Sequence, residues 1–289
     1  MNKLERVSQA IAGRGDGYVP VGVWYHFPEE SHRGAEAVAA HAKYFRDTDV
    51  DFVKAMNENV HPGDAGISTA IDWKHYRPLD VRSPQLRDQL DIIKRLADLF
   101  GDEAMVVGTV HGAVASMAHA TGRAYEARPT ALREHAREQP EHVARALAAT
   151  GEALAEFAQL SVEAGAGGIY YAAFGAERDN FTDDEFASWI APADRHVLAA
   201  AREAGAITFV HVCKTGVGLD RFVDYPTDVM NWTARGSDLS LAEGARLFAD
   251  KAILGGLDTS SPVLVSGSDA EVAALVDEAL AAAADVERF

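Results

Sequence analysis

Short apolar runs alternate along the chain with longer stretches whose apolar residues recur at helical spacing. Runs of strand length lie at residues 19–25, 50–56, 104–110, 167–172, 208–213, 228–232 and 252–257. The longest helical stretch, residues 140–164, carries Val143, Leu147, Leu154, Phe157 and Leu160 near helical spacing. Strands that alternate with amphipathic helices are typical of βα units around a parallel sheet.

Helix start signals support this division. Ser83 precedes Pro84, which places an N-cap before a proline at the first helical position. Three further segments have the spacing of a capping box, in which the first and fourth side chains bond each other's backbone. They are residues 182–185, 240–243 and 268–271. Residues 57–82 and 120–139 are predicted to be longer insertions between elements.

The predicted fold class is α/β, a (β/α)8 TIM barrel, which usually needs about 250 or more residues. The last βα unit is apparently lacking or truncated, because the chain stops at Phe289 where the eighth strand would begin. Residues 1–289 are predicted to form one barrel domain. A doubly wound sheet is the alternative, but no glycine-rich phosphate loop follows the first predicted strand. An open barrel edge would expose unpaired strand groups, so a homodimer or an extra covering segment is expected.

Composition narrows the range of partners. The 289 residues include 48% hydrophobic and 25% charged residues, and the net charge is -17. This charge disfavours nucleic acid and anionic membranes, which both attract clustered lysine and arginine. A highly anionic substrate would need a local basic pocket. No apolar run of membrane-spanning length or secretory signal is present, and a single cysteine excludes an intrachain disulfide, so a cytoplasmic location is expected.

Residues 207–213 contain the most informative pattern. They read as a buried strand whose C-terminal end carries His211 and Cys213, and Cys213 is the only cysteine. Residues two apart on a strand point to the same side, so this pair can bind one metal ion or flank one substrate. The alternative is structural, since free cysteine and hydrogen-bonded histidine are both common in protein cores.

Functional side chains also gather at the C-terminal ends of the other predicted strands, where barrel enzymes place their active sites. They are His26, Asn57, Glu58, His111, Tyr171, Glu177, Asn231, Trp232 and Asp258. Asn57 or Asp258 can instead cap the following turn, and Trp232 can belong to the core.

Several segments resemble one family in their order and spacing. They are residues 5–7, 19–22, 51–57, 168–171, 211–213, 255–258 and 267–272. Through them the chain resembles the uroporphyrinogen decarboxylase superfamily, whose (β/α)8 barrels include decarboxylases, methylcobalamin:coenzyme M methyltransferases and cobalamin-independent methionine synthase. Because the family holds several chemistries, membership does not fix the reaction.

The resemblance is nearer to the methyltransferase branch than to true uroporphyrinogen decarboxylase. The decarboxylases carry an early arginine-containing segment that grips substrate carboxylates, but residues 24–30 contain no arginine here. The family's catalytic aspartate falls near Asn57 or Glu58. In the methyltransferases a His-x-Cys pair and a later cysteine hold zinc, which implies His211 and Cys213 as ligands. Glu177, or a residue of the absent last unit, would be the third.

Three functions follow from these patterns. The first is zinc-dependent methyl transfer to a thiol from a corrinoid or related donor, with His26, Asn57, Glu58, Asn231 and Asp258 around the substrate and Glu177, His111 and Tyr171 as catalytic candidates. The second is a metal-free decarboxylase or lyase, in which His111, His211 or Tyr171 moves protons and Glu58 or Asp258 stabilises a protonated substrate. The third is a non-catalytic barrel that binds a small ligand or a corrinoid protein.

Overall fold

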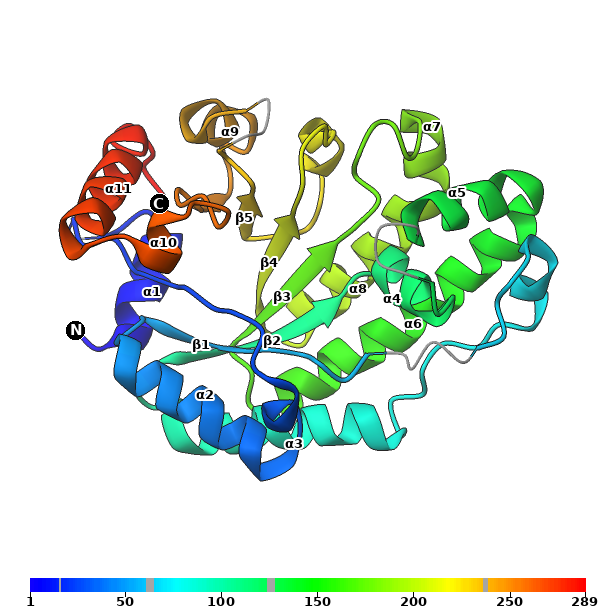
Figure 1. The fold of residues 1–289 in the computed structure, drawn as a ribbon, viewed down its shortest axis with the longest axis horizontal. Coiled ribbons are helices and arrows are strands. Elements are labelled where there is room, and N and C mark those ends of the chain that lie inside the picture. The colour runs from blue at the N-terminus through cyan, green and yellow to red at the C-terminus, as the bar shows by residue number, and fades with distance from the viewer. Residues whose placement is uncertain (16, 61–64, 124–127, 236–238) are drawn as a thin grey trace.

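A computed structural model describes residues 1–15, 17–60, 65–123, 128–235 and 239–289 of the chain. Its centre is a six-stranded parallel sheet whose strands follow one another in chain order. The strands are β1 (Phe52–Ala55), β2 (Met105–His111), β3 (Gly168–Ala173), β4 (Ile207–Val212), β5 (Val229–Trp232) and β6 (Ala252–Leu254). The sheet is curved into a half-barrel, with helices packed along its outer side (Figure 1).

Four helices pack against the outer face of the sheet, and one packs against the N-terminal ends of the strands. The outer helices are α2 (Gly34–Thr48), α3 (Pro84–Phe100), α6 (Pro140–Glu163) and α8 (Ala191–Glu203). Helix α1 (Lys3–Ile11) contacts β1, β2 and β6 and contributes Val7 to the core inside the half-barrel. Within the described residues, no helix is both long and apolar enough to span a membrane.

Shorter elements connect these parts. They are η1 (Glu29–Ser31), η2 (Ala70–His75), α4 (Ala113–Ala120), α5 (Arg128–Glu138), α7 (Asp183–Glu185), the π-helical η4 (Phe186–Ile190), η5 (Leu219–Phe222), α9 (Leu241–Leu247), α10 (Val263–Ser266) and α11 (Asp269–Ala282). The two predicted insertions contain η2 and α5.

The predicted helix starts are confirmed. Ser83 accepts a hydrogen bond from the backbone of Leu86 at the start of α3. Capping boxes formed by Thr182, Ser240 and Ser268 begin α7, α9 and α11. The long helix expected at residues 140–164 is α6. These local signals were reliable because a cap depends on a few neighbouring residues rather than on the tertiary fold.

The first predicted strand, residues 19–25, is wrong. This segment is extended but joins no ladder. Pro20 has no N–H to donate, and the N–H of Val21 bonds to the Asp51 carboxylate at 2.8 Å instead of to a strand carbonyl. In the described parts of the chain, one backbone bond, from Asp51 N to Val21 O at 2.7 Å, links the segment to the start of β1. Among the described residues the sheet is therefore an open half-barrel of six strands, where seven strands of a barrel lacking its last βα unit were expected.

The sheet has two buried faces with different roles. Outward side chains join the helices in the main core, which includes Val53, Val106 and Ile169. The lower part of the inward face is a second apolar core, made by Val7, Phe52, Met105, Val107, Tyr170, Phe209, Val229 and Ala252. Polar side chains occupy the next inward positions toward the C-terminal strand ends. Lys54, Thr109, His211 and Asn231 are placed there by the two-residue period of the strands.

Candidate functional site

A cavity of about 260 Å³ opens at the C-terminal ends of β4, β5 and β6. His211, Cys213 and Asn231 line it together, as the sequence predicted for the His-x-Cys pair. Trp24 from the extended N-terminal segment and Trp232 from β5 form apolar parts of the wall. Among the described residues, the lining of this cavity includes no charged side chain. The cavity therefore suits a small, largely uncharged molecule.

Asn231 fixes the protonation of His211. The Asn231 amide donates to the Leu254 carbonyl at 2.6 Å, which orients its oxygen toward the site. That oxygen accepts from His211 Nδ1 at 2.5 Å and from the Tyr170 hydroxyl at 2.8 Å. His211 Nδ1 therefore carries the proton, and the lone pair is on Nε2. Burial, with a smaller effect from the charge of Lys54, lowers the pKa of His211 to about 4, so the ring is neutral at pH 7.

Cys213 is held in its thiol form. Burial raises the pKa of this thiol, the charge of Lys214 opposes the rise, and the charge of Glu177 adds to it. A thiol with a raised pKa is a poor nucleophile and a poor metal ligand until something stabilises its anion. The site thus presents an imidazole lone pair and a neutral thiol to the cavity.

The described residues do not complete a zinc site of the expected kind. Imidazole nitrogen and thiolate sulfur are suitable zinc donors, but a catalytic zinc ordinarily has three protein ligands. In the part of the chain that the structure describes, no three His, Cys, Asp or Glu side chains come together as a metal-binding group. Glu177, one of the two expected sources of the third ligand, forms an ion pair with Lys214 at 2.9 Å. The described residues therefore do not fit a catalytic zinc ion.

Lys54, which sequence reasoning missed, lies in the same inward layer. It is 7% exposed, and its ammonium nitrogen lies 4.5 Å from the ring centre of Tyr170 and 5.1 Å from that of Trp24. Its hydrogen-bond acceptor is the sulfur of Met56 at 3.0 Å. Burial lowers the pKa of Lys54 to about 7, and the nearby charge of Glu58 only partly opposes this. A lysine inside an otherwise apolar strand, residues 52–56, was the signal that could have revealed it.

Tyr170, rather than the predicted Tyr171, faces the site. The Tyr170 ring stacks on His211 with centroids 5.5 Å apart and meets the Trp24 ring edge-on at 5.2 Å. Tyr171 points to the helices, where its hydroxyl donates to Asp194 and accepts from the backbone of Ala113 at 3.0 Å. The structure therefore does not bring Tyr171 together with His211.

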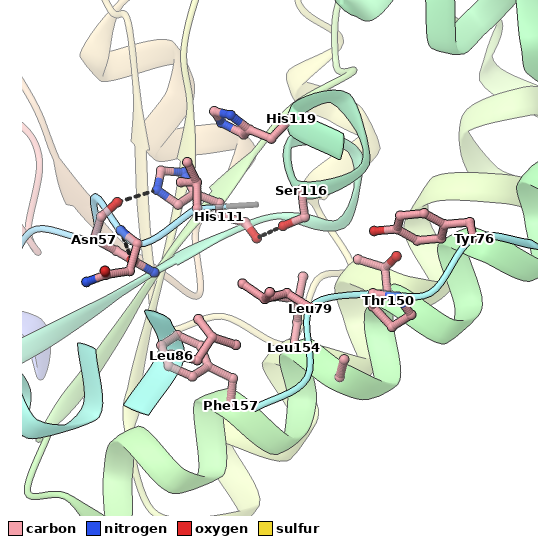
Figure 2. Close-up of a pocket in the computed structure, with 14 residues that line it drawn as sticks. Asn57, Tyr76, Leu79, Leu86, His111, Ser116, His119, Thr150, Leu154 and Phe157 are labelled. Atoms are coloured by element: carbon pink, nitrogen blue, oxygen red, sulfur yellow. Dashed lines mark hydrogen bonds between the residues drawn. The ribbon is translucent and has the colours of Figure 1, made fainter. Parts of the chain in front are cut away.

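His111 and Asn57 line a different cavity, between the ends of β1 and β2 and helices α4 and α6 (Figure 2). His111 Nε2 donates to the Asn57 carbonyl at 2.8 Å, and burial lowers the pKa of His111. The Asn57 side chain donates to Thr109 O and accepts from Asn59 N. This cavity measures about 40 Å³, which is room for roughly two or three water molecules rather than an organic substrate.

The remaining predicted site residues have local partners. His26 Nδ1 and Glu58 Oε1 are 2.6 Å apart, with the His26 side chain 71% exposed. Asp258 accepts hydrogen bonds from the backbone and hydroxyl of Ser260 at 2.9 and 2.6 Å, so it caps its own turn, which was the alternative from sequence. Of the predicted set, the structure therefore groups His211, Cys213, Asn231 and Trp232 around the larger cavity.

Comparisons with known proteins agree with this architecture. The family model for uroporphyrinogen decarboxylase (URO-D) matches residues 48–289. A methyltransferase from Methanosarcina mazei is similar in structure, with a TM-score of 0.73 at 15% identity, covering 99% of this chain and 91% of that chain. A B12-independent methionine synthase from Shewanella sp. W3-18-1 has a TM-score of 0.55 at 14% identity, covering 92% and 82%. No curated protein matches the sequence significantly.

Proposed function

Because the chain belongs to the uroporphyrinogen decarboxylase (URO-D) family, we propose that it is a methyltransferase acting on a small molecule bound beside His211 and Cys213. The observation that carries the proposal is their joint position on one cavity, with the His211 lone pair fixed on Nε2 by Asn231. The names of the two similar structures, a methyltransferase and a methionine synthase, support the same reaction class. The uncharged cavity lining disfavours a substrate with many carboxylates.

The acceptor in this proposal is a thiol, and the donor is a corrinoid-bound or related methyl group, for which free methylcobalamin is the probe. His211 Nε2 accepts a hydrogen bond from the acceptor S–H and orients its sulfur. As the new C–S bond forms, the bond between methyl and donor breaks and its electron pair stays with the donor. The sulfur becomes more acidic as it is methylated, so the proton passes to Nε2 late in the reaction.

The roles of the neighbouring residues follow from their contacts. Asn231 keeps Nδ1 of His211 protonated, and Tyr170 supports the ring from one face. Trp24 and Trp232 exclude water from the wall of the cavity. Zinc binding would need ligands beyond His211 and Cys213, and the zinc content of the protein can be measured directly.

The test combines metal analysis with a methyl-transfer assay. Elemental mass spectrometry is run on the parent protein, on Cys213→Ser, and on His196→Asn, whose histidine is half-exposed on α8 and serves as the matched control. Transfer from methylcobalamin to small thiols is then measured with and without a chelator. Near-stoichiometric zinc that is lost only in Cys213→Ser supports the zinc-dependent form. Chelator-resistant transfer that falls in His211→Ala supports the metal-free form, and no transfer by the parent to any thiol refutes the proposed function.

A further inference from the structure

Lys54 is a buried amine for which the described residues provide no oxygen acceptor. Among the described residues, its Nζ atom contacts the Met56 sulfur and the faces of the Trp24 and Tyr170 rings. A protonated amine has three N–H donors, and a thioether is a weak acceptor for only one of them. No carboxylate among the described residues forms an ion pair with it. The two aromatic faces attract the ammonium form, but they do not replace the missing acceptors. Burial therefore makes the neutral amine, with its free electron pair, far more populated than in an exposed lysine.

The neighbours of Lys54 do not form an anion-binding site. The Tyr170 hydroxyl already donates to Asn231, and His211 directs its N–H to the same amide. The imidazole group therefore offers a lone pair, which repels an anion. An anion beside Lys54 would find one donor group, whereas binding sites for carboxylates usually combine several. The arrangement suits an uncharged electrophile better than an acid.

One more polar group in this layer lacks a partner. Thr109 Oγ1 is buried and forms no hydrogen bond within the described residues. Thr109 lies opposite Tyr170 in the β2–β3 register. It shares the inward face with Lys54, because Lys54 pairs with Val107 of the inner core and Thr109 follows Val107 by two residues. Buried polar groups without partners are rare and mark a place where a ligand or water completes the bonding. Lys54 and Thr109 together indicate a polar ligand atom inside the half-barrel.

We propose that Lys54 is a nucleophilic amine that forms an imine with an aldehyde or ketone entering the half-barrel from its C-terminal side. The Nζ electron pair attacks the carbonyl carbon while the π electron pair moves to oxygen. One proton passes from nitrogen to that oxygen to give a carbinolamine. The nitrogen electron pair then forms the C=N bond as the C–O bond breaks, and the departing oxygen takes the second N–H proton and leaves as water. The step needs no oxidant, reductant or metal, and it goes beyond the proposed methyl transfer.

The charges around Lys54 set the pH range of this reactivity. The titratable groups close enough to interact with it electrostatically are Glu58, His41, His111 and His211. Burial lowers the pKa of each of these three histidines, so Glu58 supplies the one opposing charge of the set. With a pKa of about 7, roughly half of Lys54 is neutral at pH 7. The neutral fraction of an ordinary lysine is about a thousandfold smaller.

Site-resolved reductive methylation tests the proposal. The folded protein is treated with limiting formaldehyde and cyanoborohydride at pH 7, so that each imine is reduced to a methylamine, and the rate at each lysine is measured by peptide mass spectrometry. Lys43 and Lys94 are matched controls within the same chain, because their side chains are 76% and 60% exposed. The amine of Met1 is scored separately, since an ordinary α-amino pKa is also near 8.

We expect Lys54 to be methylated at least about tenfold faster than Lys43 at pH 7, a margin that leaves room for slower entry into a buried site. Above pH 8 the rate at Lys54 should level off while the rate at Lys43 keeps rising. Unfolding in urea should remove the difference. A rate at Lys54 no higher than at Lys43 in the folded protein would overturn the proposal and indicate a protonated or inaccessible amine. The labelling needs no methyl donor or turnover, so it succeeds or fails independently of the proposed function.

Discussion

Replacing Lys54 with methionine should change how the stability of the protein depends on pH. The folded pKa of Lys54 is about 7, below the ordinary value of 10.5. A lowered pKa means that the unfolded chain binds the proton more tightly, so the contribution to stability is present above the unfolded pKa and is lost as pH falls toward 7. Stability contributed by this residue should therefore rise with pH between about 7 and 10.5.

The magnitude follows from these two values. Between pH 7 and pH 8.5, the linkage relation gives an increase of about 1.7 kcal/mol in the free energy of unfolding from Lys54 alone. Solvent screening reduces this figure little, because the residue is 7% exposed. Methionine has a similar length and no charge, so Lys54→Met should keep the contacts with Trp24 and Tyr170 and lose the pH-dependent increase.

Urea denaturation at pH 7.0, 7.5, 8.0 and 8.5 measures this effect. The quantity to compare is the difference in unfolding free energy between parent and variant, because other titrating groups, including Cys213, contribute equally to both. Lys43→Met is the matched control, since the Lys43 side chain is 76% exposed and its removal should leave the slope unchanged. If Lys54→Met keeps the parental increase with pH, Lys54 is not a desolvated amine and the reasoning about its environment is wrong.

Two further predictions concern the packing of the fold. Asp194 is buried and bonded by the hydroxyls of Tyr171 and Tyr225, and burial raises its pKa to about 7, so its contribution to stability is lost as pH rises through 7. Between pH 5 and pH 8 this loss should be about 2.5 kcal/mol in the parent and absent in Asp194→Asn. Urea denaturation at both pH values measures it. An equal loss in both proteins would show that Asp194 does not have a raised pKa. Gly244→Ala should lower the melting temperature and destabilise the protein by about 1–3 kcal/mol, because the added methyl carbon would lie 2.2 Å from the Trp232 ring. Calorimetry that shows equal or higher stability would contradict this.

Much of the fold could be predicted from sequence because its signals are local. Helix caps at Ser83, Ser240 and Ser268 identify their helices within a few residues. The six strands were visible as apolar runs of the right length. Sheet closure could not be predicted in this way, because it depends on long-range pairing. At residues 19–25, Pro20 has no N–H and the N–H of Val21 bonds to the Asp51 carboxylate, so the segment forms no ladder. An apolar sequence pattern does not show this.

The site was predicted in part for a related reason. His211 and Cys213 were found because a two-residue spacing puts both on one face wherever that face points. For strands that are buried on both sides, the apolar pattern does not say which face lies inside the half-barrel. Tyr171 was therefore chosen where Tyr170 faces the site, and Lys54 was overlooked.

The two faces also explain why a shifted pKa alone would not locate the site. Lys54, His211 and Asp194 are all buried, and burial is the largest cause of the shift in each. Asp194 belongs to the outer face, where tyrosine hydroxyls from β3 and the η5–β5 loop satisfy its oxygens and leave nothing for a ligand. Lys54 and the Nε2 atom of His211 lie on the inner face, where the part of the chain that the structure describes provides no such hydroxyl partners. The chemistry of this protein should therefore respond to substitutions on the inner face, while changes on the outer face should act through stability.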